Sequence, residues 1–259
     1  MCSSDLHVLV IGGHADMGGA VIMAAEAAFA VGAGKVSVVC HERHHAAILA
    51  RSPNVMVRNI ETFTLELIEE TLQAVDAVCF GMGLGRDDWS KQVFNRWLSP
   101  ILQHSHLEVV LDADALWFLV EQAVQFSENV YLTPHSGEAA RLLGCTSHEI
   151  EQDRVAAIHA LAAKFSGQWV LKGSGSLILE NQQLWVCTAG NAGMGTGGMG
   201  DTLAGMVAGL KAQLHQEIAL HQVVTLHAQA GDLLAEQGMR GIQASHMPQA
   251  VYQVVNVHK

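Results

Sequence analysis

The residues of this chain that are best suited to catalysis lie in the glycine-rich segment 191–201. Five of the eight residues from Gly193 to Gly200 are glycine, and they lead directly into Asp201 and the apolar segment 202–210, which predicts a buried helix. Glycine lets a backbone turn tightly around a ligand, and a helix that begins there directs the positive end of its dipole at the same point. We therefore predict an anion-binding site. Its backbone N–H groups would come from Gly197, Gly198, Met199 and Gly200.

Asp201 would lie beside an anion held by this loop, where it could accept a proton from a hydroxyl group or position a metal. We expect the adjacent N–H groups to favour its charged form, which a base requires. The alternative is a flexible glycine loop in which Asp201 only caps the helix.

Short apolar runs that end in glycine or polar residues alternate with helical patterns along the chain. We predict strands at residues 6–11, 35–40, 74–80, 108–111, 129–132 and 169–173, and a hairpin of residues 176–180 and 183–187. We predict helices at 20–31, 89–102, 147–164, 202–213 and 216–237, with a short one after 248. Such alternation predicts an α/β fold with a mostly parallel central sheet and helices on both faces. Ligands of these sheets bind at the carboxyl ends of the strands, where Asp112, His135, Lys172 and Asp201 are expected.

The composition limits the classes of partner. A chain of 259 residues with 50% hydrophobic content can form one domain over residues 1–259. Its net charge of −11 argues against nucleic acid and anionic membranes as partners, since both attract a basic surface. The most apolar stretch, residues 20–39, contains Glu26 and Lys35 and does not predict a membrane span. The five cysteines form no C-x-x-C pair, which favours a reducing, cytoplasmic location, and the histidines show no zinc spacing.

Five motifs follow one another in this order: GMGLG (81–85), LDADAL (111–116), TPHSGEAARLL (133–143), LKG (171–173) and GNAGMGTGGMGD (190–201). With these motifs the chain resembles the ADP/ATP-dependent NAD(P)H-hydrate dehydratases, a family of repair enzymes with a ribokinase-like fold. The resemblance covers almost the whole chain. It implies that ADP or ATP phosphorylates the C6 hydroxyl of NADHX or NADPHX in the S epimer, and that the phosphate then leaves to regenerate NADH or NADPH. It also implies Mg²⁺, without a ligand cluster that the sequence reveals.

The resemblance assigns roles to individual residues. Asp201 is implied as the catalytic base. The positions that match contacts to NAD(P)HX are Ala20, Gly83, Gly85, His135 and Asp201. The positions that match contacts to the adenine nucleotide are Lys172, Gly173, Ser174, Gly175, Ser176 and Gly200. Asp112 and Asp114, in contrast, are expected to be structural, as a strand-end residue followed by a helix cap.

The chain departs from the family pattern in several turns. His14 stands where the family usually has Asp, and Asp16 stands where it has Gly, so Asp16 is expected to repel phosphates. Proline is common in the family at the positions of Met82, Ser136 and Ala192, and alanine at that of Gly195. Many members also carry sequence before the first strand and a fused epimerase domain, so this chain could be the C-terminal part of a longer or fused protein, or act beside a separate epimerase. A homo-oligomer is expected, and the fused bacterial relatives favour ADP.

Three other functions are compatible with parts of the pattern. A kinase for a small vitamin precursor would use the 197–201 loop equally well, but it does not explain the segments 111–116 and 133–138. A non-catalytic nucleotide sensor would accommodate Asp16. A Rossmann oxidoreductase would use the first glycine turn, although its spacing departs from G-x-G-x-x-G.

Overall fold

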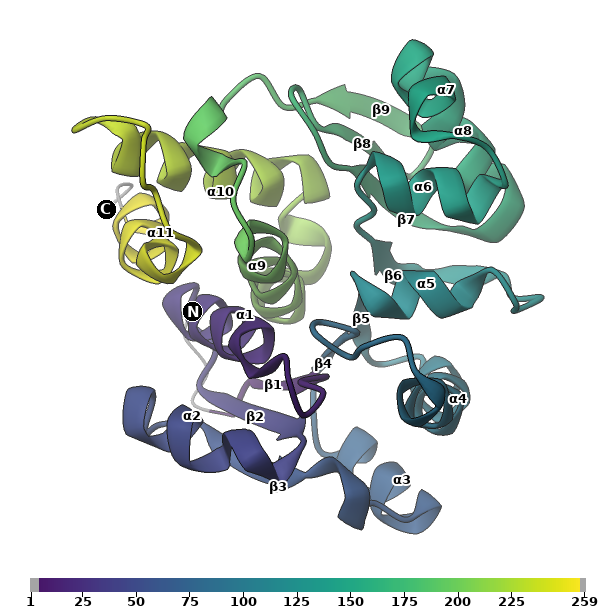
Figure 1. The fold of residues 1–259 in the computed structure, drawn as a ribbon, viewed down its shortest axis with the longest axis vertical. Helices are drawn as coiled ribbons and strands as arrows, with labels where there is room; N and C mark the ends of the chain where they lie inside the picture. The colour runs from purple at the N-terminus through teal and green to yellow at the C-terminus, as the bar shows by residue number, and fades with distance from the viewer. Residues whose placement is uncertain (1–4, 257–259) are drawn as a thin grey trace.

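The molecule is built on one twisted sheet. In the computed structural model, which describes residues 5–256, nine strands form a sheet in the order β3-β2-β1-β4-β5-β6-β7-β8-β9 (Figure 1). Strands β1 to β7 pair in parallel, and β8 and β9 continue the sheet as antiparallel strands. The strands are β1 (His7–Ile11), β2 (Lys35–Cys40), β3 (Met56–Asn59), β4 (Ala77–Phe80), β5 (Glu108–Leu111), β6 (Phe126–Leu132), β7 (Ser166–Leu171), β8 (Leu177–Glu180) and β9 (Gln183–Val186). The predicted α/β fold with a mostly parallel sheet is confirmed.

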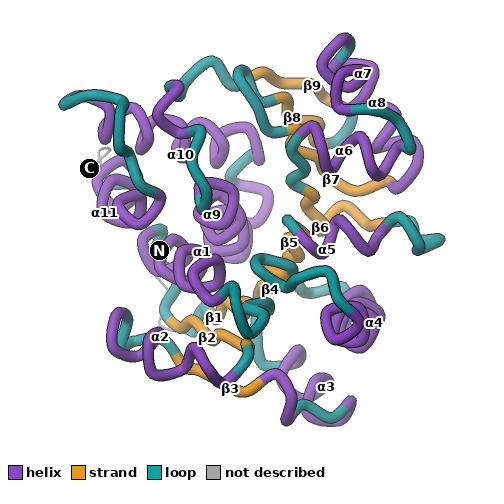
Figure 2. The backbone as a smooth tube through the Cα atoms, viewed as in Figure 1, coloured by secondary structure: helices purple, strands orange, loops and turns teal. Residues whose placement is uncertain are grey.

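Helices cover both faces of this sheet, so the central strands are apolar on both sides. In β1, Val8 and Val10 belong to one hydrophobic cluster and Leu9 and Ile11 to the other, and all four are fully buried. The first cluster is completed by α1 (Gly18–Ala30), α2 (His45–Arg51), α9 (Met199–Leu214), α10 (Leu220–Ala235) and α11 (Met247–Val255). The second is completed by α3 (Leu65–Gln73), α4 (Asp88–Gln103), α5 (Asp114–Leu119), α6 (Ser136–Leu143), α7 (Ser147–Gln152) and α8 (Arg154–Phe165). Figure 2 shows the two helical layers on either side of the strands.

Helices α1 and α9 pack closely because small residues lie between them. A Cβ atom added to Gly205 would lie 2.1 Å from the carbonyl oxygen of Ala24. The backbones therefore approach to a distance that no other residue permits. This contact fixes the start of α9, and with it Asp201, against the first βα unit.

Several boundaries differ from those predicted. β3 was not predicted at all, and α9 begins at Met199 instead of residue 202. The predicted helix 147–164 is broken at Asp153 into α7 and α8. The hairpin turn is confirmed, and both its residues, Asn181 and Gln182, have positive φ. None of the helices within residues 5–256 is long and apolar enough to cross a membrane.

Candidate active site

The carboxyl ends of the parallel strands gather the predicted site residues at one edge of the sheet. β5 ends at Leu111 and delivers Asp112, β6 delivers the segment 133–135, and β7 delivers Lys172. His135 and Lys172 form an isolated parallel bridge, and the Lys172 N–H donates to the Pro134 carbonyl oxygen at 2.8 Å. The α9 N-terminus meets them there, because a Cβ atom on Gly200 would lie 3.0 Å from Lys172 Nζ.

The glycine loop ends in a left-handed residue that opens the helix. Gly198 has φ 95° and is the N-cap of α9, where no side chain accepts a hydrogen bond from the first turn. The first N–H groups of α9 therefore remain available to a ligand. Asp201 is the third residue of the helix and is not its N-cap, so the interpretation of Asp201 as an ordinary cap is wrong.

An ion pair between Lys172 and Asp112 lies directly beside this helix end. Lys172 Nζ is 2.7 Å from Asp112 Oδ1 and 3.9 Å from Glu138 Oε2, and the Asp112 side chain is 2% exposed. Burial lowers the pKa of Lys172, but the carboxylates of Asp112 and Glu138 more than compensate, and the net pKa is raised. Lys172 thus carries its charge into the site.

The charge state of Asp201 differs from the one expected from the sequence. Burial, together with the nearby carboxylates of Asp112 and Asp114, raises the pKa of Asp201 to about 7 against the opposing charge of Lys172. The prediction that the adjacent N–H groups would hold Asp201 in its charged form is therefore wrong. A carboxyl group that titrates near neutrality is nevertheless well suited to a general base, since such a group can both accept and release a proton at neutral pH.

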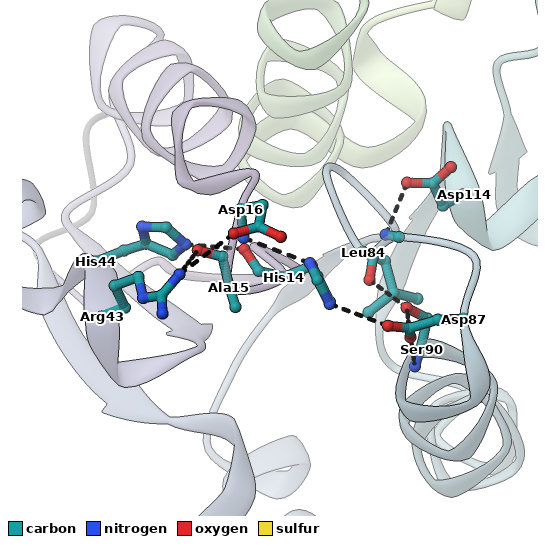
Figure 3. A network of polar contacts seen from close by, with 10 residues as sticks. His14, Ala15, Asp16, Arg43, His44, Leu84, Asp87, Ser90 and Asp114 are labelled. Carbon is teal, nitrogen blue, oxygen red and sulfur yellow. Dashed lines mark hydrogen bonds and ion pairs between the residues drawn. The ribbon is translucent and has the colours of Figure 1, made fainter.

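Asp112 and Asp114 hold other parts of the site, as their expected structural role requires. Asp114 accepts hydrogen bonds from the Gly85 N–H at 2.9 Å (Figure 3) and from Arg86 Nε at 2.7 Å. The expected helix cap is wrong, because Ala113, with φ 53°, occupies the N-cap position of α5. The two carboxylates thus tie β5 to Lys172 on one side and to the 83–86 turn on the other.

The positions matched to the dinucleotide lie around this second turn. A Cβ atom on Gly83 would lie 3.1 Å from Ala20 Cβ, and one on Gly85 would lie 3.2 Å from His14 Cγ. Gly83 and Gly85 both have positive φ, so glycine satisfies the turn as well as the close approach. The structure therefore brings Ala20, Gly83 and Gly85 together.

Two of the residues that depart from the family pattern, His14 and Asp16, are held in a polar network (Figure 3). His14 Nε2 is 3.2 Å from Asp87 Oδ2, and the His14 carbonyl oxygen is 2.8 Å from His44 Nε2. Arg43 Nη1 lies 3.2 Å from Asp16 Oδ1. The charge of Asp16 is thus partly neutralised, which weakens its expected repulsion of phosphates.

His135 begins α6 and caps it. Its Nδ1 accepts hydrogen bonds from the N–H groups of Gly137 and Glu138, and the Glu138 side chain accepts from the His135 N–H, which completes a capping box. Burial lowers the pKa of His135, with Lys172 adding to this effect. The ring is therefore neutral at pH 7, and because Nδ1 accepts, Nε2 carries the proton. The structure thus gives His135 a donor at Nε2 next to the bridge with Lys172.

A cavity of about 750 Å³ lies beside Lys172, which is one of its lining residues. The six residues matched to the nucleotide all line it, namely Lys172, Gly173, Ser174, Gly175, Ser176 and Gly200. Met199 of the predicted anion site also lines the cavity. Gly197 and Gly198, which precede Met199 in the loop, are not among the lining residues. His227, which the sequence analysis assigned no role, also lines this cavity, and its Nε2 lies 3.1 Å from Thr202 Oγ1. Burial lowers the pKa of His227 to about 4, so this histidine is neutral, and no spacing in the sequence indicates it.

Within residues 5–256, no group of three or more His, Cys, Asp or Glu side chains could hold a metal ion. Magnesium commonly keeps several water ligands and binds through substrate phosphates with few protein carboxylates. The residues present therefore suit an ion carried by a nucleotide, and they do not form a protein cage for it.

Comparison with known proteins gives consistent matches. The chain is 45% identical over 244 residues to the bifunctional NAD(P)H-hydrate repair enzyme Nnr of Coxiella burnetii, which covers 93% of this chain and 48% of that protein. It is 35% identical over 234 residues to the ADP-dependent (S)-NAD(P)H-hydrate dehydratase of Enterococcus faecalis, which covers 88% of this chain and 77% of that protein. The chain spans about half the length of the bifunctional relatives it matches.

Solved structures agree with the fold. A ribokinase-like superfamily protein from Enterococcus faecalis superposes with a TM-score of 0.87 at 30% identity, covering 97% of this chain and 87% of that one. The ADP/ATP-dependent NAD(P)H-hydrate dehydratase of Bacillus subtilis, crystallised with ATP and Mg²⁺, has a TM-score of 0.81 at 24% identity, covering 97% and 92%. The expected ribokinase-like fold is confirmed.

A family model described as NAD(P)H-hydrate dehydratase matches residues 8–252, which is nearly the whole chain. Together with the five motifs and the gathered site, this match shows that the chain belongs to the NAD(P)H-hydrate dehydratase family.

Proposed function

We propose that this chain dehydrates the S epimer of NADHX or NADPHX to NADH or NADPH, using ADP or ATP as phosphoryl donor. One observation carries the proposal. Asp201, with a pKa near 7, lies in the uncapped first turn of α9, beside a lysine that lines a cavity of about 750 Å³. The E. faecalis relative is named an ADP-dependent (S)-NAD(P)H-hydrate dehydratase, which supports the substrate and the donor.

The reaction would proceed in two steps. The Asp201 carboxylate accepts the proton of the C6 hydroxyl, and the oxygen attacks the terminal phosphorus of ADP or ATP, releasing AMP or ADP. Inorganic phosphate then leaves C6 with its bonding electrons, C5 loses a proton, and the ring double bond is restored. Phosphoryl transfer of this kind needs positioning and charge neutralisation more than covalent help.

The proposed donors match those needs. The N–H groups of Met199 and Gly200 begin α9 and could bind the transferred phosphoryl group. Lys172 adds a positive charge close to this phosphoryl group, because its Nζ would lie 3.0 Å from a Cβ atom on Gly200. When bound, Mg²⁺ would neutralise the phosphate oxygens, and the Bacillus neighbour crystallised with ATP and Mg²⁺ supports this cofactor.

The surrounding assignments are proposals of the same kind. Ala20, Gly83, Gly85 and His135 would contact NAD(P)HX, and residues 172–176 would contact the adenine nucleotide. Several relatives of about twice this length are named bifunctional, which supports an accompanying repair activity such as NAD(P)HX epimerase. We also propose that residues 1–259 act as one dehydratase domain, in a homo-oligomer.

The test is recovery of NADH absorbance after mixing the protein with prepared NADHX, magnesium and either ADP or ATP. Recovery that requires nucleotide and disappears in Asp201→Asn supports the proposal, and the faster nucleotide identifies the donor. If a folded protein that binds ADP shows no recovery of NADH absorbance, the proposed function is refuted. A stable phosphorylated product would then indicate a small-molecule kinase, and nucleotide binding without turnover would indicate a sensor.

A further inference from the structure

The nucleotide loop, residues 172–176, is held partly by its own Ser176, whose Oγ accepts from the Gly173 N–H at 3.3 Å and donates to the Gly173 carbonyl oxygen at 3.2 Å. It joins β7 to β8 and contains Gly173, Ser174, Gly175 and Ser176 in succession. Gly173 and Gly175 have φ values of 155° and 70°. Glycine and serine otherwise favour flexible backbone, so contacts from outside the loop add to those of Ser176 in presenting a fixed surface to a ligand.

Arg154 supplies two such contacts from a neighbouring helix. Its Nη2 donates to the Leu171 carbonyl oxygen at 2.9 Å, and its Nη1 donates to the Ser174 carbonyl oxygen at 3.0 Å. The guanidinium is planar and rigid, so the two bonds fix the two carbonyls, one at each side of Lys172 and Gly173, relative to each other. The Arg154 side chain is 15% exposed, with its bond to Leu171 partly buried and its bond to Ser174 at the exposed end of the loop.

The absence of a side chain at Gly173 makes this contact possible. A Cβ atom there would lie 2.7 Å from Arg154 Nη1 and 2.9 Å from Nη2. Any other residue would displace the guanidinium from the loop. The close approach of Arg154 therefore requires glycine at position 173, as does the backbone conformation there.

The bond to Ser174 also fixes the direction of the next backbone N–H, which belongs to Gly175, a residue that lines the nucleotide cavity. The peptide bonds of residues 5–256 are all trans, so the Ser174 carbonyl and the Gly175 N–H point in opposite directions. Holding the carbonyl on Arg154 thus turns the Gly175 N–H away from the arginine. In the described part of the chain no hydrogen bond uses this N–H, and Gly175 lines the cavity.

The break between α7 and α8 brings Arg154 to this position. Asp153 ends α7 and caps α8, with its Oδ1 accepting from the Ala156 N–H at 2.8 Å, so Arg154 is the first residue of α8. Glu151 lies 4.0 Å from Arg154 Nη1 and also accepts a hydrogen bond from Ser136, the neighbour of His135. Arg154 itself is not among the residues that line the cavity.

We propose that Arg154 is a positioning residue for the adenine nucleotide, which fixes the loop 172–176 through the Leu171 and Ser174 carbonyls so that Gly175 presents its N–H to the ligand. The inference rests on the proposed function in that the ligand of this loop is ADP or ATP. Arg154 does not itself contact the nucleotide. Its removal therefore weakens nucleotide binding and leaves the binding of NADHX unchanged.

The test compares Arg154→Gln and Arg154→Lys with the wild-type protein. Calorimetry measures the dissociation constant of ADP, steady-state kinetics measure KM for ADP and for NADHX separately, and thermal unfolding without nucleotide reports the fold. Arg51→Gln is the matched control, because Arg51 also forms two hydrogen bonds through its guanidinium, to Glu26, but is not among the residues that line the nucleotide cavity.

We expect Arg154→Gln to weaken ADP binding at least about tenfold, as the loss of a charged hydrogen bond does, with KM for NADHX unchanged. The ADP affinity of Arg154→Lys should lie between those of the wild type and Arg154→Gln, because lysine keeps the charge without the planar pair of donors. Unchanged ADP affinity in Arg154→Gln overturns the inference while the proposed function stands. A loss of NADHX affinity as large as that of ADP affinity, together with a lower unfolding temperature, also overturns the inference, since this result shows a general structural role. Failure of the wild-type protein to bind either ADP or ATP removes both the inference and the proposed function.

Discussion

Asp201→Asn should stabilise the unliganded protein at pH 8 while it abolishes dehydration. The folded state raises the pKa of Asp201 from the ordinary 3.8 to about 7, because the carboxyl group is buried and lies beside other carboxylates. Between these two pH values the folded protein holds a proton that the unfolded chain has released. The free energy of unfolding therefore falls as the pH rises through this window. An uncharged asparagine of nearly the same shape does not undergo this loss.

The size of the effect follows from the difference in pKa. A change from 3.8 to about 7 corresponds to about 4 kcal/mol at about 1.36 kcal/mol per pKa unit. This figure is an upper bound, because the site can relax and admit water around the charged form. We expect Asp201→Asn to exceed the wild-type protein in stability by about 1 to 4 kcal/mol at pH 8 and by much less at pH 5.

Urea unfolding at pH 5 and pH 8 measures this difference, and Glu70→Gln, which alters an exposed carboxyl group on α3, is the control. The control should show no comparable dependence on pH. If Asp201→Asn differs from wild type by the same amount at both pH values, ionisation of Asp201 carries no penalty and the reasoning is refuted. The activity assay gives a second check, since turnover by wild type should rise as the pH increases through about 7.

Three further substitutions test the packing and charge of the fold by urea unfolding. Lys172→Met leaves the carboxylate of Asp112, 2% exposed, without its partner and should cost about 3 to 5 kcal/mol, whereas adding Asp112→Asn should recover much of this loss. Gly205→Ala puts a Cβ atom 2.1 Å from a carbonyl oxygen of α1 and should cost about 1 to 3 kcal/mol, while Gly19→Ala in α1, with nothing within 4 Å, should be neutral or slightly stabilising. A neutral Gly205→Ala would contradict the close approach of α1 and α9. Gln182→Gly relieves a positive φ of 63° in the hairpin turn and should add about 1 kcal/mol, and a loss of stability would contradict this turn geometry.

The sequence predicted the sheet well wherever a strand is buried on both faces. Such strands are continuous apolar runs, as in β1 and β4, and the glycine or polar residue that ends each run marks the edge where ligands bind. β3 could not be found in this way. Its residues alternate between exposed and half-buried, and it becomes a strand through backbone pairing with β2. That pairing is not encoded in its side-chain pattern.

The break at Asp153 shows a second kind of limit. The segment 147–164 has few residues that disfavour a helix, and its capping box at Thr146 is confirmed. Asp153 can either continue a helix or cap a new one, and the choice depends on contacts outside the segment. One of these is the pair of hydrogen bonds from Arg154 to Leu171 and Ser174. A residue whose partners are backbone carbonyls distant in the sequence gives no motif of its own.

The charge of Asp201 shows the same limit in the electrostatics of the site. Local reasoning counted the N–H groups of α9, which are neighbours in sequence, and predicted a stabilised carboxylate. The folded chain also buries Asp201 and brings Asp112 and Asp114, from the end of β5, close enough to raise its pKa against the charge of Lys172. These contributions depend on strand order, so the direction of the shift could be known only from the structure. The same arrangement makes Asp201 costly to ionise and suitable as a base near neutral pH, so we expect stability and activity to change in opposite directions at this position.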